Sequence, residues 1–296
     1  MAFVNSEGVN LYYEETGSGH PLLFLHEFGG DARTWEQQVR HFSRRYRCIV
    51  TAARGYPPSD VPGDEDAYGW EQNISDAVAV LDHLEIYQTH VIGLSMGAYI
   101  GLMLAMRHSG RVSALVAASG GSGSHPPTRE DFIRETLMAA ERTLLEGGVP
   151  AEEMANGPNR IQLKRKDPRG WAEFRDQLAE HPATGSAYTQ KRVQAVRPGL
   201  HDFETELASV GVPTLLMVGD EDEGCLDINL WLKRTMPMSG LSVFPKSGHL
   251  LNLEEPERFN NLCAEFLSVS ENGQWHKRDA STLSARMYGQ GQKFDS

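Results

Sequence analysis

The regular alternation of short apolar runs with amphipathic stretches constrains the fold of this chain most strongly. Strand-like runs lie at 22–25, 48–53, 91–94 and 112–118, and helix-like stretches lie between them at 35–45, 70–86 and 96–106. Short apolar strands that alternate with helices predict a mostly parallel sheet with helices on both faces. The alternating run at 9–15 precedes a glycine-rich turn, and we expect it to form an antiparallel hairpin with 22–25.

The pattern changes after residue 127. Residues 128–200 are charged and rich in helical periodicity, and they contain no clear strand. Strand-like runs return at 213–219 and 241–244, before a closing helix at 255–267. These shifts predict a core interrupted by a helical insertion. The predicted division is a core of residues 1–127 and 201–270, a cap of residues 128–200 and a C-terminal extension of residues 271–296.

The composition excludes several classes of partner. Lys and Arg total 28 against 40 Asp and Glu, a net charge of −12, and no basic run occurs. Nucleic acids and anionic membranes require clustered positive charge, so we expect neither as a partner. No apolar run is long enough to span a bilayer, and the first residues do not resemble a signal peptide.

Cysteine usage predicts a reducing, cytoplasmic setting. The cysteines are Cys48, Cys225 and Cys263, an odd number spread along the chain without a C-x-x-C pair. This spacing argues against a disulfide framework and against a zinc cluster. The chain also lacks the H-E-x-x-H, G-x-G-x-x-G and P-loop patterns, so we predict no metal site and no cofactor.

The sharpest local motif is a G-x-S-x-G that runs from Gly93 to Gly97 around Ser95. It follows the apolar run 91–94 and opens the helical stretch 96–106, which is the setting of a nucleophile elbow. A sharp turn exposes the serine hydroxyl, and the helix N-terminus beneath it favours a developing negative charge. The alternative is a glycine-rich turn that holds an incidental serine.

A nucleophilic serine needs a base and an acid that orients the base. His249 follows the run 241–244 and is the favoured base, since that position lies at the same sheet edge as Ser95. His125 and His181 lie in loops and are weaker alternatives.

The run 213–219 leads into an acidic cluster that offers the orienting acid. Asp222 is the favoured residue and Asp220 the second choice. The alternative is a solvated acidic loop without a catalytic role.

The order Ser95, Asp222, His249 along an alternating chain resembles the α/β-hydrolase family, in particular its small, capped, esterase-like and C–C-hydrolase-like members. The resemblance covers about residues 3–269. It implies a mostly parallel eight-stranded sheet with an inserted helical cap. The motifs that carry it are LFLHEFGG at 23–30, ARGYPPSD at 53–60, GDED at 219–222 and SGH at 247–249.

The resemblance also implies an oxyanion hole formed by the backbone N–H groups of Phe28 and Met96. It assigns His26 a structural role in holding the loop that contains Phe28. Glu27 departs from the family pattern, which has glycine at this position. Either its carboxylate turns away and pairs with a basic side chain, or it tunes His26 or disfavours anionic substrates.

These features predict a serine hydrolase that cleaves a carboxylic ester, or a related acyl bond, of a small apolar or aromatic substrate through an acyl-enzyme. Alternatives are a C–C bond hydrolase or lactonase on the same triad, or a ligand-binding receptor with vestigial hydrolysis. A homodimer through the cap or the C-terminal extension is a further hypothesis. Candidate substrate contacts besides Glu27, with cap packing as their alternative role, are Phe132, Met138, Trp171 and Tyr188.

Overall fold

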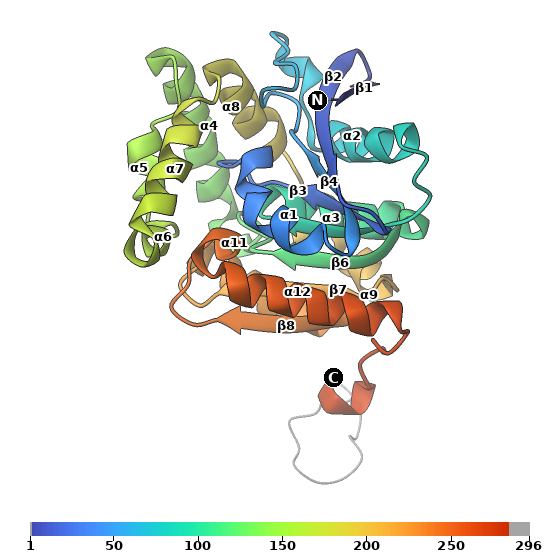
Figure 1. Ribbon diagram of the computed structural model, residues 1–296. Helices are drawn as coiled ribbons and strands as arrows, with labels where there is room; N and C mark the ends of the chain where they lie inside the picture. Colours follow the sequence, from blue (N-terminus) through green and yellow to red (C-terminus); the bar gives the residue numbers. More distant parts are fainter. Residues whose placement is uncertain (1, 284–296) are drawn as a thin grey trace.

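One eight-stranded sheet organises the protein (Figure 1). The computed structural model describes residues 2–283, and residues 1 and 284–296 lie outside the described part. Along the sheet the strand order is β1-β2-β4-β3-β5-β6-β7-β8. The strands are β1 (Ala2–Ser6), β2 (Val9–Thr16), β3 (His20–Leu25), β4 (Tyr46–Thr51), β5 (Thr89–Leu94), β6 (Val112–Ala118), β7 (Thr214–Gly219) and β8 (Ser239–Phe244).

Six neighbouring strands of the sheet pair in parallel, as the alternation of strands and helices predicts: β4, β3, β5, β6, β7 and β8. Their side chains are buried on both faces. In β3, for example, Leu22 and Phe24 pack in one hydrophobic cluster while Leu23 and Leu25 pack in the other. Apolar side chains on both sides of the strand explain why these segments are continuous apolar runs.

The predicted hairpin between residues 9–15 and 22–25 is wrong. β2 pairs antiparallel with β1 and with β4, whereas β3 lies between β4 and β5 in parallel orientation. The hairpin turn is formed by Glu7 and Gly8, which both have positive φ (50° and 86°) and connect β1 to β2. Such a two-residue turn fits the twist of paired strands. The short, partly polar β1 was not recognised as a strand from the sequence.

Helices cover both faces of the sheet, and further short helices flank it. One face packs against α1 and α12, and the other against α2, α3 and α10. The helix predicted at 35–45 is shorter, because a 3-10 turn at Ala32–Trp35, capped by Asp31, precedes α1. The core helices are α1 (Glu36–Phe42), α2 (Trp70–His83), α3 (Met96–Arg107), α9 (Glu204–Ser209), α10 (Glu223–Thr235), α11 (Leu251–Glu254) and α12 (Pro256–Glu271).

Five helices between β6 and α9 gather at one end of the sheet, and the arrowheads of β6 and β8 point toward them (Figure 1). This group, called the cap below, therefore lies at the carboxyl ends of the parallel strands. Ligands of open α/β sheets bind at this edge. The cap helices are α4 (Arg129–Glu146), α5 (Ala151–Ala155), α6 (Ile161–Lys166), α7 (Pro168–Ala179) and α8 (Ala183–Thr189).

The chain beyond α12 returns to its own core. Trp275 Nε1–H donates to the Met238 carbonyl oxygen at 2.7 Å, and its ring packs edge-on against Phe266. The Arg278 N–H donates to the Pro237 carbonyl oxygen. Residues 275–278 of the predicted extension 271–296 therefore contact the core, and its residues 284–296 lie outside the described part. None of the helices in residues 2–283 is long and apolar enough to cross a lipid bilayer.

A buried ion pair between Arg54 and Asp76 yields a test of the fold. Arg54 donates from Nε and Nη2 to the two carboxylate oxygens of Asp76 at 2.7 and 2.6 Å, and both side chains are at least nine-tenths buried. We expect Arg54→Met to lower the unfolding free energy by about 3–5 kcal/mol, because it leaves an uncompensated buried carboxylate. Urea denaturation at neutral pH measures the change.

The matched control is Arg40→Met, since the pair of Arg40 with Glu36 is exposed on α1. An exposed i,i+4 pair contributes little, so this variant should unfold like the unmodified protein. Equal effects of Arg54→Met and Arg40→Met would show that the buried pair does not support the fold.

Candidate active site

Ser95 occupies the turn between β5 and α3 in a strained conformation. Its φ and ψ are 52° and −105°, which a residue with a Cβ rarely adopts. A Cβ on Gly93 would collide with the backbone of Gly97, and a Cβ on Gly97 would collide with the carbonyl oxygen of Leu25. Glycine at both positions therefore allows the turn to close, as predicted for a nucleophile elbow.

The surroundings of Ser95 favour a negative charge beside it. Ser95 precedes Met96, the first residue of the twelve-residue helix α3. The N–H of a first helical residue has no intrahelical acceptor, and the helix dipole places positive potential at this end. The Ser95 N–H itself donates to the Ala118 carbonyl oxygen at the end of β6. The turn thus lies at the carboxyl edge of the sheet.

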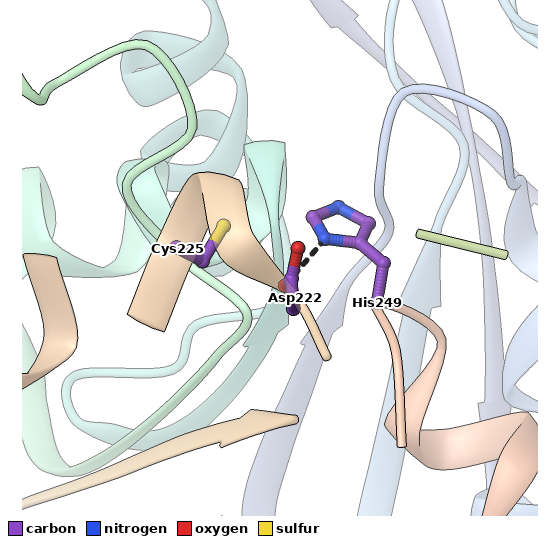
Figure 2. Close-up of side chains that lie close together, drawn as sticks. All are labelled: Asp222, Cys225 and His249. Atoms are coloured by element: carbon purple, nitrogen blue, oxygen red, sulfur yellow. Dashed lines mark hydrogen bonds and ion pairs between the residues drawn. The ribbon is translucent and has the colours of Figure 1, made fainter. Parts of the chain in front are cut away.

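His249 and Asp222 form a buried hydrogen-bonded pair (Figure 2). Asp222 directly precedes α10, and His249 follows β8 in the loop that leads to α11. The His249 Nδ1–H donates to Asp222 Oδ2 at 2.8 Å, and both side chains are almost fully buried. Asp220 instead accepts a hydrogen bond from the Ser247 N–H. The structure therefore brings Asp222, the favoured acid, to the imidazole.

The charge of Asp222 controls the protonation of His249. Burial by itself would lower the pKa of the imidazole. The negative charge of Asp222 and its hydrogen bond outweigh this effect, and they hold the pKa of His249 well above its ordinary value. The imidazolium form is therefore strongly stabilised at this position.

A third group, the thiol of Cys225, lies beside this pair, and no sequence motif indicated it. Its sulfur, a carboxylate oxygen of Asp222 and a ring nitrogen of His249 all lie within 4.8 Å of one another. Burial and the charge of Asp222 raise the pKa of the thiol. The sequence does contain one indication that Cys225 lies near Asp222. The two residues are three positions apart at the start of a helix, and such residues lie on the same side of it.

Ser95 and the group around His249 both contact the end of β6. The Ser95 N–H donates to the carbonyl oxygen of Ala118, the last residue of β6, and the Cys225 thiol, which lies near His249, donates to that of Ser119, the next residue. The Ser95 hydroxyl makes no hydrogen bond to His249 or to any other side chain within residues 2–283. Catalytic hydrogen bonds are often long or poorly aligned in ligand-free enzymes and tighten when substrate binds.

The loop after β3 is fixed by His26 and Tyr56. The His26 Nδ1–H donates to the Glu27 carbonyl oxygen at 2.7 Å, and Nε2 accepts from the Ala53 N–H at 3.0 Å. Burial lowers the pKa of His26, which agrees with this neutral tautomer. The Tyr56 hydroxyl donates to the Phe28 carbonyl oxygen. His26 thus holds the loop, in line with the structural role that the resemblance implies.

Glu27 pairs with Arg160, the residue that precedes α6 in the cap. Arg160 Nη2 donates to Glu27 Oε2 at 2.8 Å, and both side chains are at least nine-tenths buried. Burial would raise the pKa of Glu27, but the positive charges of Arg160 and His249 hold it below its ordinary value. The expected pairing with a basic side chain is confirmed.

The same cap segment also contacts the loop of His249. The His249 N–H donates to the Asn159 carbonyl oxygen at 2.7 Å, and a Cβ on Gly248 would collide with that oxygen. Asn159 and Arg160 therefore bind the histidine loop and the Glu27 loop together. The cap thus contributes directly to the arrangement of the candidate catalytic loops.

The other predicted substrate contacts lie in different surroundings. Trp171 is buried inside the cap, where its Nε1–H donates to the Ala155 carbonyl oxygen at 2.7 Å. Met138 is 62% exposed on α4, so the structure does not pack it against the site. Phe132 packs on Gly123, and Tyr188 contacts the ring of Tyr68 edge-on. Trp171 thus serves cap packing, which was the alternative considered for all four residues.

The ionised Glu27 predicts a specific acid sensitivity. Its folded-state pKa lies below the ordinary value of 4.5. The stabilisation is therefore present above that value and is lost as the pH falls through the lowered pKa. When the pH falls from about 6 to about 3.5, we expect the unfolding free energy to drop less in Glu27→Gln than in the unmodified protein. Urea denaturation at both pH values measures this difference.

Glu173→Gln is the control, since Glu173 is exposed in a surface pair with Arg169. It should retain the pH dependence of the unmodified protein. Equal acid losses in the unmodified protein and in Glu27→Gln would contradict the prediction.

Comparisons with known proteins agree with this architecture. The sequence profile of the Alpha/beta hydrolase family matches residues 22–262. An AB hydrolase superfamily protein of Bacillus subtilis is 28% identical over 274 residues, covering 88% of this chain and 96% of the relative. A 2-hydroxymuconate semialdehyde hydrolase of Pseudomonas sp. (strain CF600) is 28% identical over 271 residues, covering 89% and 92%.

Solved structures show the same fold. A thermophilic esterase from Thermogutta terrifontis superposes with a TM-score of 0.81 at 27% identity, covering 91% of this chain and 98% of the esterase. The family match spans most of the chain, and relatives that cover about nine-tenths of it include a hydrolase and an esterase. The chain therefore belongs to the α/β hydrolase family, and it is an enzyme, a hydrolase.

Proposed function

We propose that this hydrolase cleaves carboxylic esters through a covalent acyl-enzyme on Ser95. One observation carries the proposal. The strained Ser95 turn, at the N-terminus of α3, lies at the same sheet edge as the buried His249–Asp222 pair. A hydroxyl, an imidazole and a carboxylate in this order form the set that activates a serine for acyl transfer.

His249 acts as the base. Its Nδ1–H is held by Asp222, which leaves Nε2 to accept the proton of the Ser95 hydroxyl as the oxygen attacks the ester carbonyl carbon. Asp222 then stabilises the imidazolium, consistent with the raised pKa of His249. The imidazolium returns the proton to the departing alcohol. His249 next activates a water that releases the acid and frees Ser95.

The negative charge on the carbonyl oxygen needs preorganised donors. The N–H groups of Met96 and Phe28 are the proposed donors. Met96 supplies the free N–H of a helix start, and Phe28 lies in the loop that His26 and Tyr56 hold. Within residues 2–283, no acceptor engages the Phe28 N–H, so it is available to the substrate.

A second candidate is hydrolysis of a C–C bond or a lactone on the same residues. The observation in its favour is the set of relatives, which includes a 2-hydroxymuconate semialdehyde hydrolase at 28% identity and a structure of an N-acyl homoserine lactone degrading enzyme at 27%. A screen of small apolar and aromatic esters, lactones, thioesters and vinylogous diketones separates these substrates. Turnover restricted to diketones or lactones would replace the ester proposal.

Ser95 gives the first test of the mechanism. We expect Ser95→Ala to lower kcat for esters by at least about 10³-fold, because the nucleophile is lost and only binding and the oxyanion donors remain. A fluorophosphonate probe should label the unmodified protein at Ser95, as measured by mass spectrometry of the digested protein.

Ser113→Ala is the matched control, since Ser113 lies near the start of β6 and bonds to His90. It should keep both turnover and labelling. Near-normal hydrolysis by Ser95→Ala would refute the mechanism. A protein that neither reacts with the probe nor turns over any screened substrate would instead be a ligand-binding receptor.

The role of Asp222 can be tested through the pH dependence of kcat/KM. The charge of Asp222 raises the pKa of His249, and the base works only when the ring is neutral. Asp222→Asn should therefore shift the rising limb of the kcat/KM profile toward lower pH. It should also lower kcat by about 10⁴-fold, because the tautomer is no longer held. Asp220→Asn should keep the original profile, and the assignment fails if Asp220→Asn reproduces both effects.

A further inference from the structure

We propose that Asp222, Cys225 and His249 form a binding site for thiophilic divalent cations such as Zn²⁺ or Cd²⁺, and that occupation of this site inhibits the enzyme. The inhibition rests on the proposed function of His249, whereas the binding does not. The three groups come from two segments, the start of α10 and the loop after β8, and Figure 2 shows them at one point of the fold.

The donor set suits these cations. A carboxylate oxygen, a thiol sulfur and an imidazole nitrogen all lie within 4.8 Å of one another. Zinc binds such ligands tetrahedrally at about 2.0–2.3 Å, which places the donor atoms roughly 3–4 Å apart. Small side-chain adjustments would therefore bring the three donors onto one ion.

A water molecule can take the fourth position. Three protein ligands and one water form the tetrahedral set of an open zinc site. Ser122 Oγ lies 3.1 Å from the Cys225 sulfur and is a polar neighbour for such a water. Soft thiolate ligation selects zinc-like cations over magnesium or calcium, which prefer oxygen ligands.

The charge of the bound cation is balanced by its ligands. The starting state is the one that the proposed mechanism uses, with neutral His249 donating from Nδ1 to ionised Asp222. On binding, the Cys225 thiol proton leaves to solvent and the ring proton of His249 moves from Nδ1 to Nε2, while bonds form from the cation to nitrogen, sulfur and the Asp222 oxygen. The dication then balances one thiolate and one carboxylate. The buried site therefore gains no uncompensated charge, which would be costly.

Occupation would block the reaction at the base. A cation on Nδ1 leaves the remaining ring proton on Nε2, so His249 can no longer accept the proton of Ser95. It also breaks the hydrogen bond from His249 to Asp222. Because all three ligands are buried, binding requires local opening. Inhibition should therefore develop over time after the cation is added.

Direct binding is tested on the full chain without a histidine tag, in the Ser95→Ala background, which is inactive under the proposed mechanism. Titration with Cd²⁺ should produce the ultraviolet charge-transfer band of a cadmium–thiolate bond with one ion per chain. Cys225→Ala should abolish the band. The control Cys263→Ala should keep it, because Cys263 is equally buried and belongs to no such group of ligands within residues 2–283.

Inhibition is tested with the active protein after preincubation with Zn²⁺. Rates are compared with each variant's own metal-free rate, and we expect Cys225→Ala to need at least about tenfold more Zn²⁺ for half-inhibition, since even outer-shell partners change metal affinity by that factor. Cys225→Ser provides a second variant of nearly native volume if Cys225→Ala folds poorly. Circular dichroism checks the folding of both variants.

The outcomes separate the two proposals. Absence of a thiolate band, or a band that survives Cys225→Ala, overturns the metal site and leaves the hydrolase mechanism untouched. A protein that binds Cd²⁺ at Cys225 but hydrolyses no ester overturns only the proposed function. Equal Zn²⁺ sensitivity of the unmodified protein and both Cys225 variants overturns the claim that this site causes inhibition.

Discussion

The close approach of α3 to the sheet is the constraint on which the candidate site depends. Gly97 packs directly on the carbonyl oxygen of Leu25, the last residue of β3, and no side chain would fit between them. The strained Ser95 turn precedes this contact, and the loop that holds Phe28 follows Leu25. One glycine contact therefore positions the candidate nucleophile and a candidate oxyanion donor relative to each other. Because protein interiors are close-packed, a shift of α3 against the sheet would be transmitted to Ser95 and Phe28. The packing of the core therefore sets the distance between the candidate nucleophile and the candidate oxyanion donor.

The buried charges of Glu27 and Asp222 are both paired, and the cap supplies one of the partners. Arg160 neutralises Glu27 in the loop after β3, and Asn159 binds the backbone of His249. The electrostatic environment of the site is therefore assembled from both the core and the cap. A cap that moved away would leave a buried carboxylate without its partner, which is costly. This coupling favours a cap that stays in contact with the catalytic loops at residues 159–160.

The sequence predicted much of this arrangement, and its errors have physical causes. The hairpin expected between the β2 and β3 segments is wrong because the true hairpin partner of β2 is β1, which is short and partly polar and therefore carries a weak strand pattern. The position of Cys225 beside Asp222 and His249 was not predicted, because a single cysteine at the start of a helix belongs to no established metal or redox motif. The partner of Glu27 was foreseen only as a basic side chain, since Arg160 is one of many in the insertion. Trp275, beyond the closing helix, returns to the core through one hydrogen bond and one ring contact.

The sequence by itself determined the alternation of strands and helices in the core from β3 onward, the elbow at Ser95, and the placement of His249 and the acidic cluster after their strands. These features depend on local hydrophobic periodicity and on glycine at positions where a Cβ would collide. Only the tertiary structure decided that Asp222 rather than Asp220 meets the imidazole, and that Cys225 and Arg160 join the site. Those pairings join distant segments through side-chain direction and packing, which local propensity does not encode.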